Sequence, residues 1–203
     1  MGYKENAAGS TTAPYVVTLG TAGGPRWWTD NQGQPRQGIA TAVVVEDGWY
    51  LVDCGSGVGR QIRSAGLSMV DLKGIFITHM HSDHIVDLAS LMLFAPFEIK
   101  DSQKPPIPIF GPGSRGRITP MSPRAQSTPE PVNPNDPGAG IESTFAGLVS
   151  AFSADFNDRM RDSLTPGPYD HFAPHDIEIP ETVHFDPDEN VAPEMNPLVV
   201  FQD

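Results

Sequence analysis

Hydrophobic and polar positions alternate along the first 113 residues with the spacing of strands at some places and of helices at others. The predicted strands cover residues 15–20, 39–45, 49–53, 75–77 and 106–110. The Asp47-Gly48 pair between the second and third runs is typical of a tight hairpin turn. Apolar residues at helical spacing predict helices over 57–66 and 82–93, and Gly66 is expected to end the first of them. This alternation predicts a layered α/β domain.

The chain changes character after this region. Residues 114–139 are rich in Pro, Ser, Gly and Asn, which predicts an irregular segment, and apolar residues near one face predict an amphipathic helix over about 141–162. A Pro-rich, acidic loop follows, and a new strand is expected to begin just before the last residue, so we expect a truncated fold. The expected parts are a disordered leader at 1–14, a half-domain at 15–113, a Pro-rich insertion at 114–197 and the start of the next strand at 198–203.

The amino-acid composition of the chain narrows the classes of molecule that it is expected to bind. The formal net charge of −12 disfavours nucleic acid, because nucleic-acid binding usually needs a basic stripe and the basic cluster here, Arg115, Arg117 and Arg124, is thin. Cys54 is the only cysteine, so no disulfide can form within the chain. This favours a cytoplasmic protein, although a secreted protein that has lost its signal is an open alternative. No run reaches the roughly 18 apolar residues of a membrane helix, so no membrane partner is expected.

The sequence THMHSDH at 78–84 carries the strongest chemical signal. In extended backbone, residues two apart point to the same side, so His79 and His81 can offer two imidazoles to one ion. Asp83 and His84, at the start of the next helix, can reach a second position beside the first. Imidazole nitrogen and carboxylate oxygen are preferred donors for Zn²⁺ and related metals. A His-rich surface loop is the alternative, but four donors within six residues favour a two-metal site.

This motif resembles the H-x-H-x-D-H signature of the metallo-β-lactamase superfamily. Three other segments resemble the tRNase Z and arylsulfatase-like branches of that superfamily: VTLGTAGGP at 17–25, LVDCG at 51–55 and IFGP at 109–112. The resemblance covers roughly residues 15–113. It implies the αββα sandwich of the family, truncated here after the first half.

The resemblance also implies roles for individual residues. His79 and His81 would be ligands of the first metal, and Asp83 and His84 ligands of the second, with Asp83 also holding the attacking water. Asp53 would support these ligands through a hydrogen bond, unless it is simply a turn-forming Asp. The implied cofactor is Zn²⁺, two ions in the complete site, with Mn²⁺ or Fe also compatible.

The family completes its site with a third His, a bridging Asp and a final His that normally lie beyond a region like 198–201. The remaining histidines, His171, His175 and His184, stand among Pro and acidic residues, where an isolated His is usually solvated. Recruitment of one of them as a ligand is the alternative. The chain alone is therefore expected to hold an incomplete site, with the other ligands supplied by a further segment or another polypeptide.

Three functions follow as hypotheses. The first is metal-dependent hydrolysis of a small phosphate, sulfate or carboxylic ester, as in phosphodiesterase and arylsulfatase-like enzymes. Its apolar substrate cleft would be lined by Trp27, Trp28 and the Phe-rich helix at 145–156, unless these residues serve ordinary packing. The second is tRNA 3′ processing, which requires a basic patch. The third is a non-catalytic interaction module that keeps part of the site. A homo-oligomer is compatible with all three.

Overall fold

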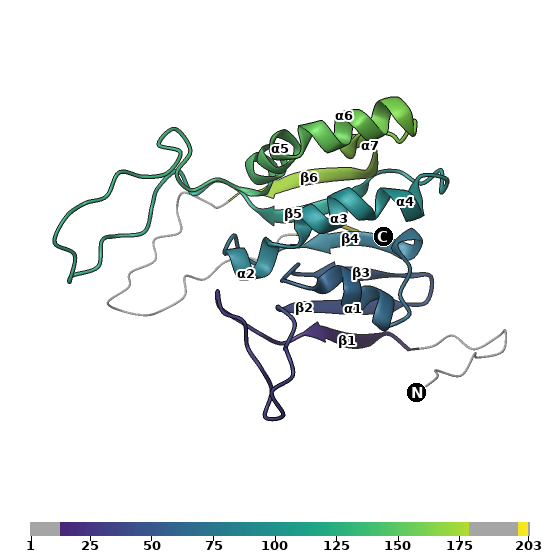
Figure 1. The fold of residues 1–203 in the computed structure, drawn as a ribbon, viewed down its shortest axis with the longest axis horizontal. Helices are drawn as coiled ribbons and strands as arrows, with labels where there is room; N and C mark the ends of the chain where they lie inside the picture. The colour runs from purple at the N-terminus through teal and green to yellow at the C-terminus, as the bar shows by residue number, and fades with distance from the viewer. Residues whose placement is uncertain (1–12, 179–198, 203) are drawn as a thin grey trace.

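The computed structural model describes residues 13–178 and 199–202, and its central element is a six-stranded mixed sheet in which the strands follow the order of the chain (Figure 1). The strands are β1 (Tyr15–Gly20), β2 (Ala40–Val45), β3 (Gly48–Val52), β4 (Leu72–Phe76), β5 (Ile107–Pro112) and β6 (Phe172–Ile177). β1, β2 and β3 pair antiparallel, whereas β3 to β6 run parallel. The predicted hairpin and the predicted α/β class are confirmed.

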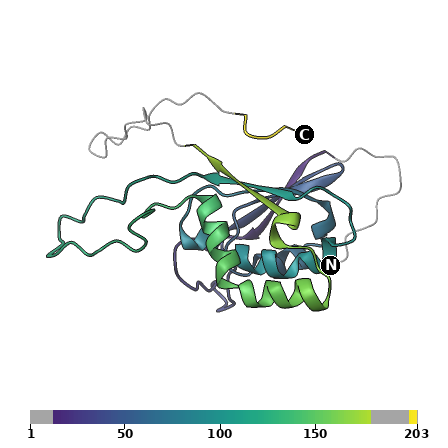
Figure 2. The same cartoon turned by 90° about the horizontal axis from the view of Figure 1, so that it is seen from above.

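Helices cover one face of this sheet, as Figure 2 shows. They are α1 (Val58–Ser64), a 3₁₀ turn η1 (Met69–Asp71), α2 (Ser82–Ile85), α3 (Leu88–Phe94), α4 (Pro96–Ile99), α5 (Ile141–Ala151), α6 (Ser153–Asp162) and α7 (Pro168–His171). The core between helices and sheet is built around large, fully buried side chains such as Trp49, Phe145 and Phe172. One sheet with helices on one face corresponds to the first half of the predicted αββα sandwich.

The other face of the sheet carries an aromatic cluster. Tyr50, Phe76 and Phe110 come from the neighbouring strands β3, β4 and β5, and the Phe76 and Phe110 rings stack with centroids 5.5 Å apart. Phe201 lies against all three rings at 5.8 to 6.4 Å. The segment that holds Phe201 therefore covers part of the face that the helices leave bare (Figure 2).

Two predicted helices are each divided in the structure. The helix expected at 82–93 is divided into α2 and α3, because the Asp87 backbone N–H donates to the carbonyl of Cys54 at 3.0 Å instead of continuing the helical ladder. The helix expected at 141–162 is divided into α5 and α6 at Phe152, whose backbone leaves the helical conformation. Gly66 ends α1 as predicted, with a left-handed φ of 75°.

The prediction of an insertion over 114–197 is wrong for its later part. β6 lies inside that range and pairs with β5 as the last strand of the sheet. Its Pro174 conceals the strand in the sequence, but a proline is tolerated on an edge strand because one side needs no ladder hydrogen bonds. Residues 114–139 are irregular as predicted and form an arm that extends away from the sheet in Figure 1.

The predictions for the two ends of the chain are tested only in part. Of the expected leader at 1–14, residues 1–12 lie outside the described residues. Of the strand expected at 198–203, residues 199–202 are described and form no strand, since Phe201 packs on the face of the sheet rather than along an edge. No helix within the described parts of the chain is long and apolar enough to cross a membrane.

Candidate metal centre

The predicted donors, His79, His81, Asp83 and His84 (the donor cluster), gather at the carboxyl ends of the parallel strands. Asp53 follows β3 directly, and the cluster follows β4 through a short connection into α2. In open parallel sheets this edge is where ligands bind, because the loops that leave neighbouring strands meet there. The strand order therefore brings residues 53 and 79–84 together.

Asp53 is the most deeply buried polar group of the site. It is only 4% exposed, and its carboxylate accepts hydrogen bonds from the backbone N–H and the hydroxyl of Thr78, at 2.8 and 2.9 Å. The Nδ1 atom of His84 donates to the other carboxylate oxygen at 2.8 Å. The backbone of Asp53 has φ of 61°, a left-handed conformation that Asp tolerates better than most residues.

The bond to Asp53 fixes the orientation of His84. With its proton on Nδ1, the ring presents the lone pair of Nε2, the atom that a metal would take. This Nε2 lies 3.4 Å from an oxygen of Asp83. Asp53 therefore lies beside the donor cluster. Its role in supporting the metal ligands stays a prediction, and this geometry suits it.

The two other histidines lie beside His84. The ring of His79 is 3.8 Å from that of His84 and 4.8 Å from that of His81, measured between centroids. Partial burial lowers the pKa of His79, and the neighbouring His84 and His81 lower it further. A neutral imidazole is the form that binds metal ions, so this environment favours the state that coordination requires.

Asp83 is held in its ionised form. Burial alone would raise the pKa of Asp83, but the hydrogen bond from the Gly24 N–H, at 2.6 Å, and the nearby His84 and His79 outweigh it and lower the pKa. The same hydrogen bond connects α2 to the Gly-rich loop after β1. Sequence reasoning missed this role of Gly24, and it missed Thr78 although Thr78 directly precedes the motif.

The donor atoms of the cluster are of the kinds that Zn²⁺ prefers, but they do not converge on one position for the ion. Imidazole and carboxylate are the right donors, but the ring of His79 lies closer to that of His84 than to that of His81, so the predicted pairing of the ligands stays a prediction. Within residues 13–178 and 199–202, however, no three side chains of His, Cys, Asp or Glu are placed to hold one ion. Zinc sites use at least three protein ligands, so the cluster needs further donors.

The other histidines do not supply these donors within the described residues. His171 is buried at the end of α7, next to the opposite ends of the strands, and His175 lies on β6 with its ring stacked on Phe110 at 5.1 Å. His184 lies outside the described residues. Cys54 is fully buried; burial raises the pKa of its thiol, and Asp87 and Asp53 raise it further, so the environment disfavours the reactive thiolate.

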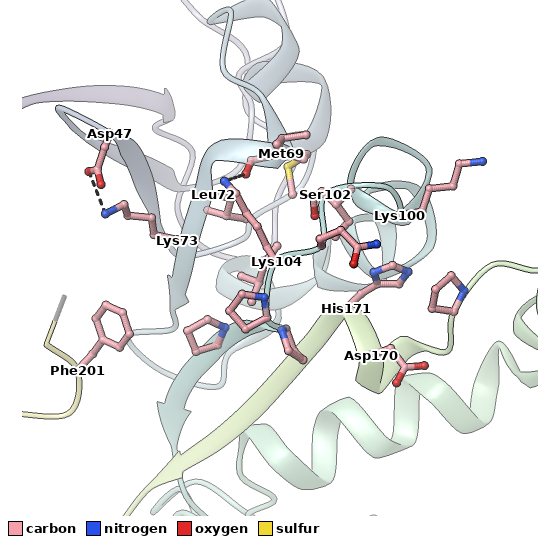
Figure 3. A pocket seen from close by; sticks show the side chains of 18 residues that line it. Asp47, Met69, Leu72, Lys73, Lys100, Ser102, Lys104, Asp170, His171 and Phe201 are labelled. Atoms are coloured by element: carbon pink, nitrogen blue, oxygen red, sulfur yellow. Dashed lines mark hydrogen bonds and ion pairs between the residues drawn. The ribbon is translucent and has the colours of Figure 1, made fainter.

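A cavity of about 510 Å³ lies at that opposite end of the strands and contains none of the donor cluster (Figure 3). Its cationic side chains are already engaged in part, since Lys73 pairs with Asp47 at 2.9 Å and Lys104 donates to the carbonyl of Val70 at 2.5 Å. His171 also lines it and is 7% exposed, and its buried Nε2 has no hydrogen-bond partner among the residues that the structure describes. We assign this cavity no part in the metal chemistry.

The environment of His171 predicts a pH-dependent stability. Burial lowers the pKa of His171, and Asp170 opposes this shift only partly, so the unfolded chain takes up the proton first as the pH falls. This contribution to stability is complete above about pH 6.5 and is lost as the pH falls toward the lower pKa of the folded state. In urea unfolding between pH 7.5 and 5, we expect His171→Phe to lose less stability than the wild type. Parallel pH curves for the two proteins would contradict this prediction.

A family model and several curated proteins match parts of this chain. The family model described as Anti-Pycsar protein Apyc1 matches residues 41–110, which include Asp53 and the whole cluster. Ribonuclease Z of Pseudomonas putida (strain W619) is 50% identical over 62 residues, which are 30% of this chain and 19% of that protein. Ribonuclease Z of Thermoplasma acidophilum is 35% identical over 97 residues, 48% of this chain and 29% of that protein. The chain thus spans less than a third of these relatives.

The likeness extends further in three dimensions. The crystal structure of the short form of human tRNase Z matches with a TM-score of 0.52 and 21% sequence identity, over 94% of this chain and 56% of that one. At this identity the match concerns the fold alone. It includes the later part of the chain, where the sequence suggested an insertion.

Proposed function

We propose that this chain, which has a metallo-β-lactamase fold related to that of tRNase Z, carries the metal-binding half of a phosphodiesterase. The observation that supports this most is the joining of Asp53, Thr78 and His84 by hydrogen bonds behind the donor cluster. A buried carboxylate that orients a histidine is an arrangement typical of metal sites.

The reaction follows from the chemistry of the residues present. A bound Zn²⁺ would lower the pKa of water and stabilise charge on the phosphate oxygens, and Mn²⁺ or Fe is compatible with the same donors. His79 and His81 would hold one ion, and His84, oriented by Asp53, would hold the second together with Asp83. Gly24 holds Oδ2 of Asp83, so Oδ1 is the atom that we assign to accept a proton from the attacking water.

Among the phosphate, sulfate and carboxylic esters that the sequence left open, we favour phosphodiesters. The two relatives described above are both named Ribonuclease Z, and the bonds of RNA are phosphodiesters. A small diester suits a chain with a net charge of −12 better than a long polyanion does. Because no three of the described side chains are placed to hold one ion, we expect the remaining ligands to come from outside the described residues or from another polypeptide.

The test is metal content combined with hydrolysis. We expect the purified chain, loaded with Zn²⁺ or Mn²⁺, to cleave bis(4-nitrophenyl) phosphate. Where another polypeptide is found to carry the remaining metal ligands, it is added to the assay. Cleavage of 4-nitrophenyl sulfate and 4-nitrophenyl acetate should be much slower. Absence of bound metal together with absence of diester cleavage would refute the proposal and favour the non-catalytic module.

RNA 3′ processing remains the second candidate because of the arm at 114–139. It projects from the domain and carries Arg115, Arg117 and Arg124, although Glu130 and Asp136 offset part of this charge. If the arm binds tRNA, a shift assay should give an affinity that falls steeply between 50 and 200 mM salt, on the order of ten-fold for two to three phosphate contacts. Absence of binding at 50 mM salt would dismiss this candidate.

A further inference from the structure

The segment between β1 and β2, residues 22–38 (the Trp loop), leaves the sheet at the same end as α2 (Figure 1). Its own hydrogen bonds shape it. Ala22 and Gly38 form a bridge at its base, and Thr29 and Pro35 form another near its tip. Asp30 closes the tip by accepting hydrogen bonds from the backbone of residues 32 and 34, each at 2.8 Å. The Trp loop is therefore held in one shape although it is exposed.

The Trp loop is connected directly to the donor cluster. Gly24 belongs to it and donates to Asp83 at 2.6 Å. Between the Trp loop and α2 lies a cavity of about 420 Å³, within the usual range for sites that bind small molecules. Its chemically informative lining residues are Arg26, Trp27, Trp28, Arg36, Ser82 and Asp83. One wall of this cavity is thus the metal-binding helix itself.

The two tryptophans are not explained by packing. Trp27 is 98% exposed and Trp28 is 42% exposed, whereas Trp49 is buried in the core. The Trp28 ring is fixed, because its Nε1 donates to the carbonyl of Gly23 at 2.7 Å. Ordinary packing, the alternative that the sequence left open, does not account for Trp27, since its indole is almost free of contacts with the described part of the chain.

The arginine side chains around the two tryptophans indicate which kind of ligand would fit this cavity. The guanidinium of Arg26 lies 5.8 Å from the ring centre of Trp28, and Arg36 is anchored to Thr21 at 2.6 Å. Two arginines therefore face this cavity in a chain whose net charge is −12. Indole faces stack on nucleobases, and guanidinium groups pair with phosphates.

We propose that the Trp loop is a nucleotide-recognition element: the base stacks on Trp27, Arg26 pairs with a phosphate, and the phosphodiester to be cleaved extends toward Asp83. The proposal rests on the proposed function for the reaction and names its substrate class, a base-bearing phosphodiester. Nucleotide binding itself requires neither metal nor turnover, so it can be tested separately.

The test compares two phosphates that differ only in the base. Calorimetric titration of the full chain in the presence of a chelator should show adenosine 5′-monophosphate binding roughly ten-fold or more tightly than ribose 5-phosphate, the size of one stacking contact. Trp27→Ala should lower the affinity for adenosine monophosphate to that for ribose 5-phosphate. Arg26→Gln should weaken both ligands by a similar factor. Phe94→Ala, a change at another exposed aromatic residue, on α3 and outside this cavity, should alter neither affinity.

Each result has a distinct meaning. Equal affinities of the wild type for the two ligands, or a base preference that survives Trp27→Ala, would overturn the recognition element. Trp27 is exposed, so an unchanged thermal midpoint will exclude misfolding as the cause of a loss. If the wild type hydrolyses methyl 4-nitrophenyl phosphate but binds adenosine 5′-monophosphate and ribose 5-phosphate equally well, this inference alone is refuted. Base preference without hydrolysis of any diester would refute the proposed function and leave a nucleotide-binding site.

Discussion

His81→Ala is expected to abolish metal loading and to reduce diester hydrolysis by more than the roughly 10–100-fold that loss of an outer hydrogen-bond partner costs. His81 and His79 are the two side chains that we assign to the first ion, and a single imidazole binds zinc weakly. Elemental analysis of the purified variant and its rate on bis(4-nitrophenyl) phosphate measure both effects.

His175→Ala is the matched control for this variant. His175 is also an exposed histidine, but it stacks on Phe110 away from the donor cluster. Its replacement should leave metal content and rate at the level of the wild type. Full metal loading in His81→Ala would show that the ion, if one binds, does not use this side chain, and the assignment of the motif would fail.

Gly55→Ala should cost about 3 kcal/mol of stability and weaken metal binding, because a Cβ atom has no space at this position. It would lie 2.6 Å from the carbonyl oxygen of Asp83 and 2.6 Å from backbone atoms of both Gly38 and Ile39. All three neighbours are backbone, so relief requires that the loops after β1, β3 and β4 move apart. That movement would displace Asp83. Urea unfolding followed by circular dichroism measures the loss of stability.

Gly147→Ala makes the same chemical change where space is free. Gly147 lies within α5, and a methyl group added to its Cα would meet no atom within 4 Å outside the adjoining turns of its own helix. Alanine is the better helix former, so this variant should be more stable than the wild type by about 1 kcal/mol. Equal effects of the two substitutions would refute the explanation by close packing of the loops.

The donor cluster could be predicted from the sequence because its geometry is local. His79 and His81 are separated by one residue, and only Ser82 separates His81 from Asp83 and His84, so no knowledge of distant contacts is needed. The first five strands and the hairpin followed from runs of β-branched residues for the same reason. Asp53 was identified by resemblance, and its bonds to Thr78 and His84 became visible only once β3 and β4 were paired.

What sequence reasoning missed depends on contacts between distant residues. The break between α2 and α3 results from the hydrogen bond between Asp87 and Cys54, which are far apart in the chain. β6 contains Pro174 and polar residues, and it is a strand because β5 offers it an edge. The nearly complete exposure of Trp27 could not be predicted either, since a tryptophan in a sequence is equally consistent with a core position.

The left-handed backbone of Asp53 sets two effects of one substitution against each other. That conformation costs about 1 kcal/mol for a residue with a side chain, and glycine would adopt it freely. A glycine there would remove the carboxylate that accepts hydrogen bonds from both Thr78 and His84. Asp53→Gly would therefore relax the backbone and at the same time leave the imidazole of His84 free to rotate.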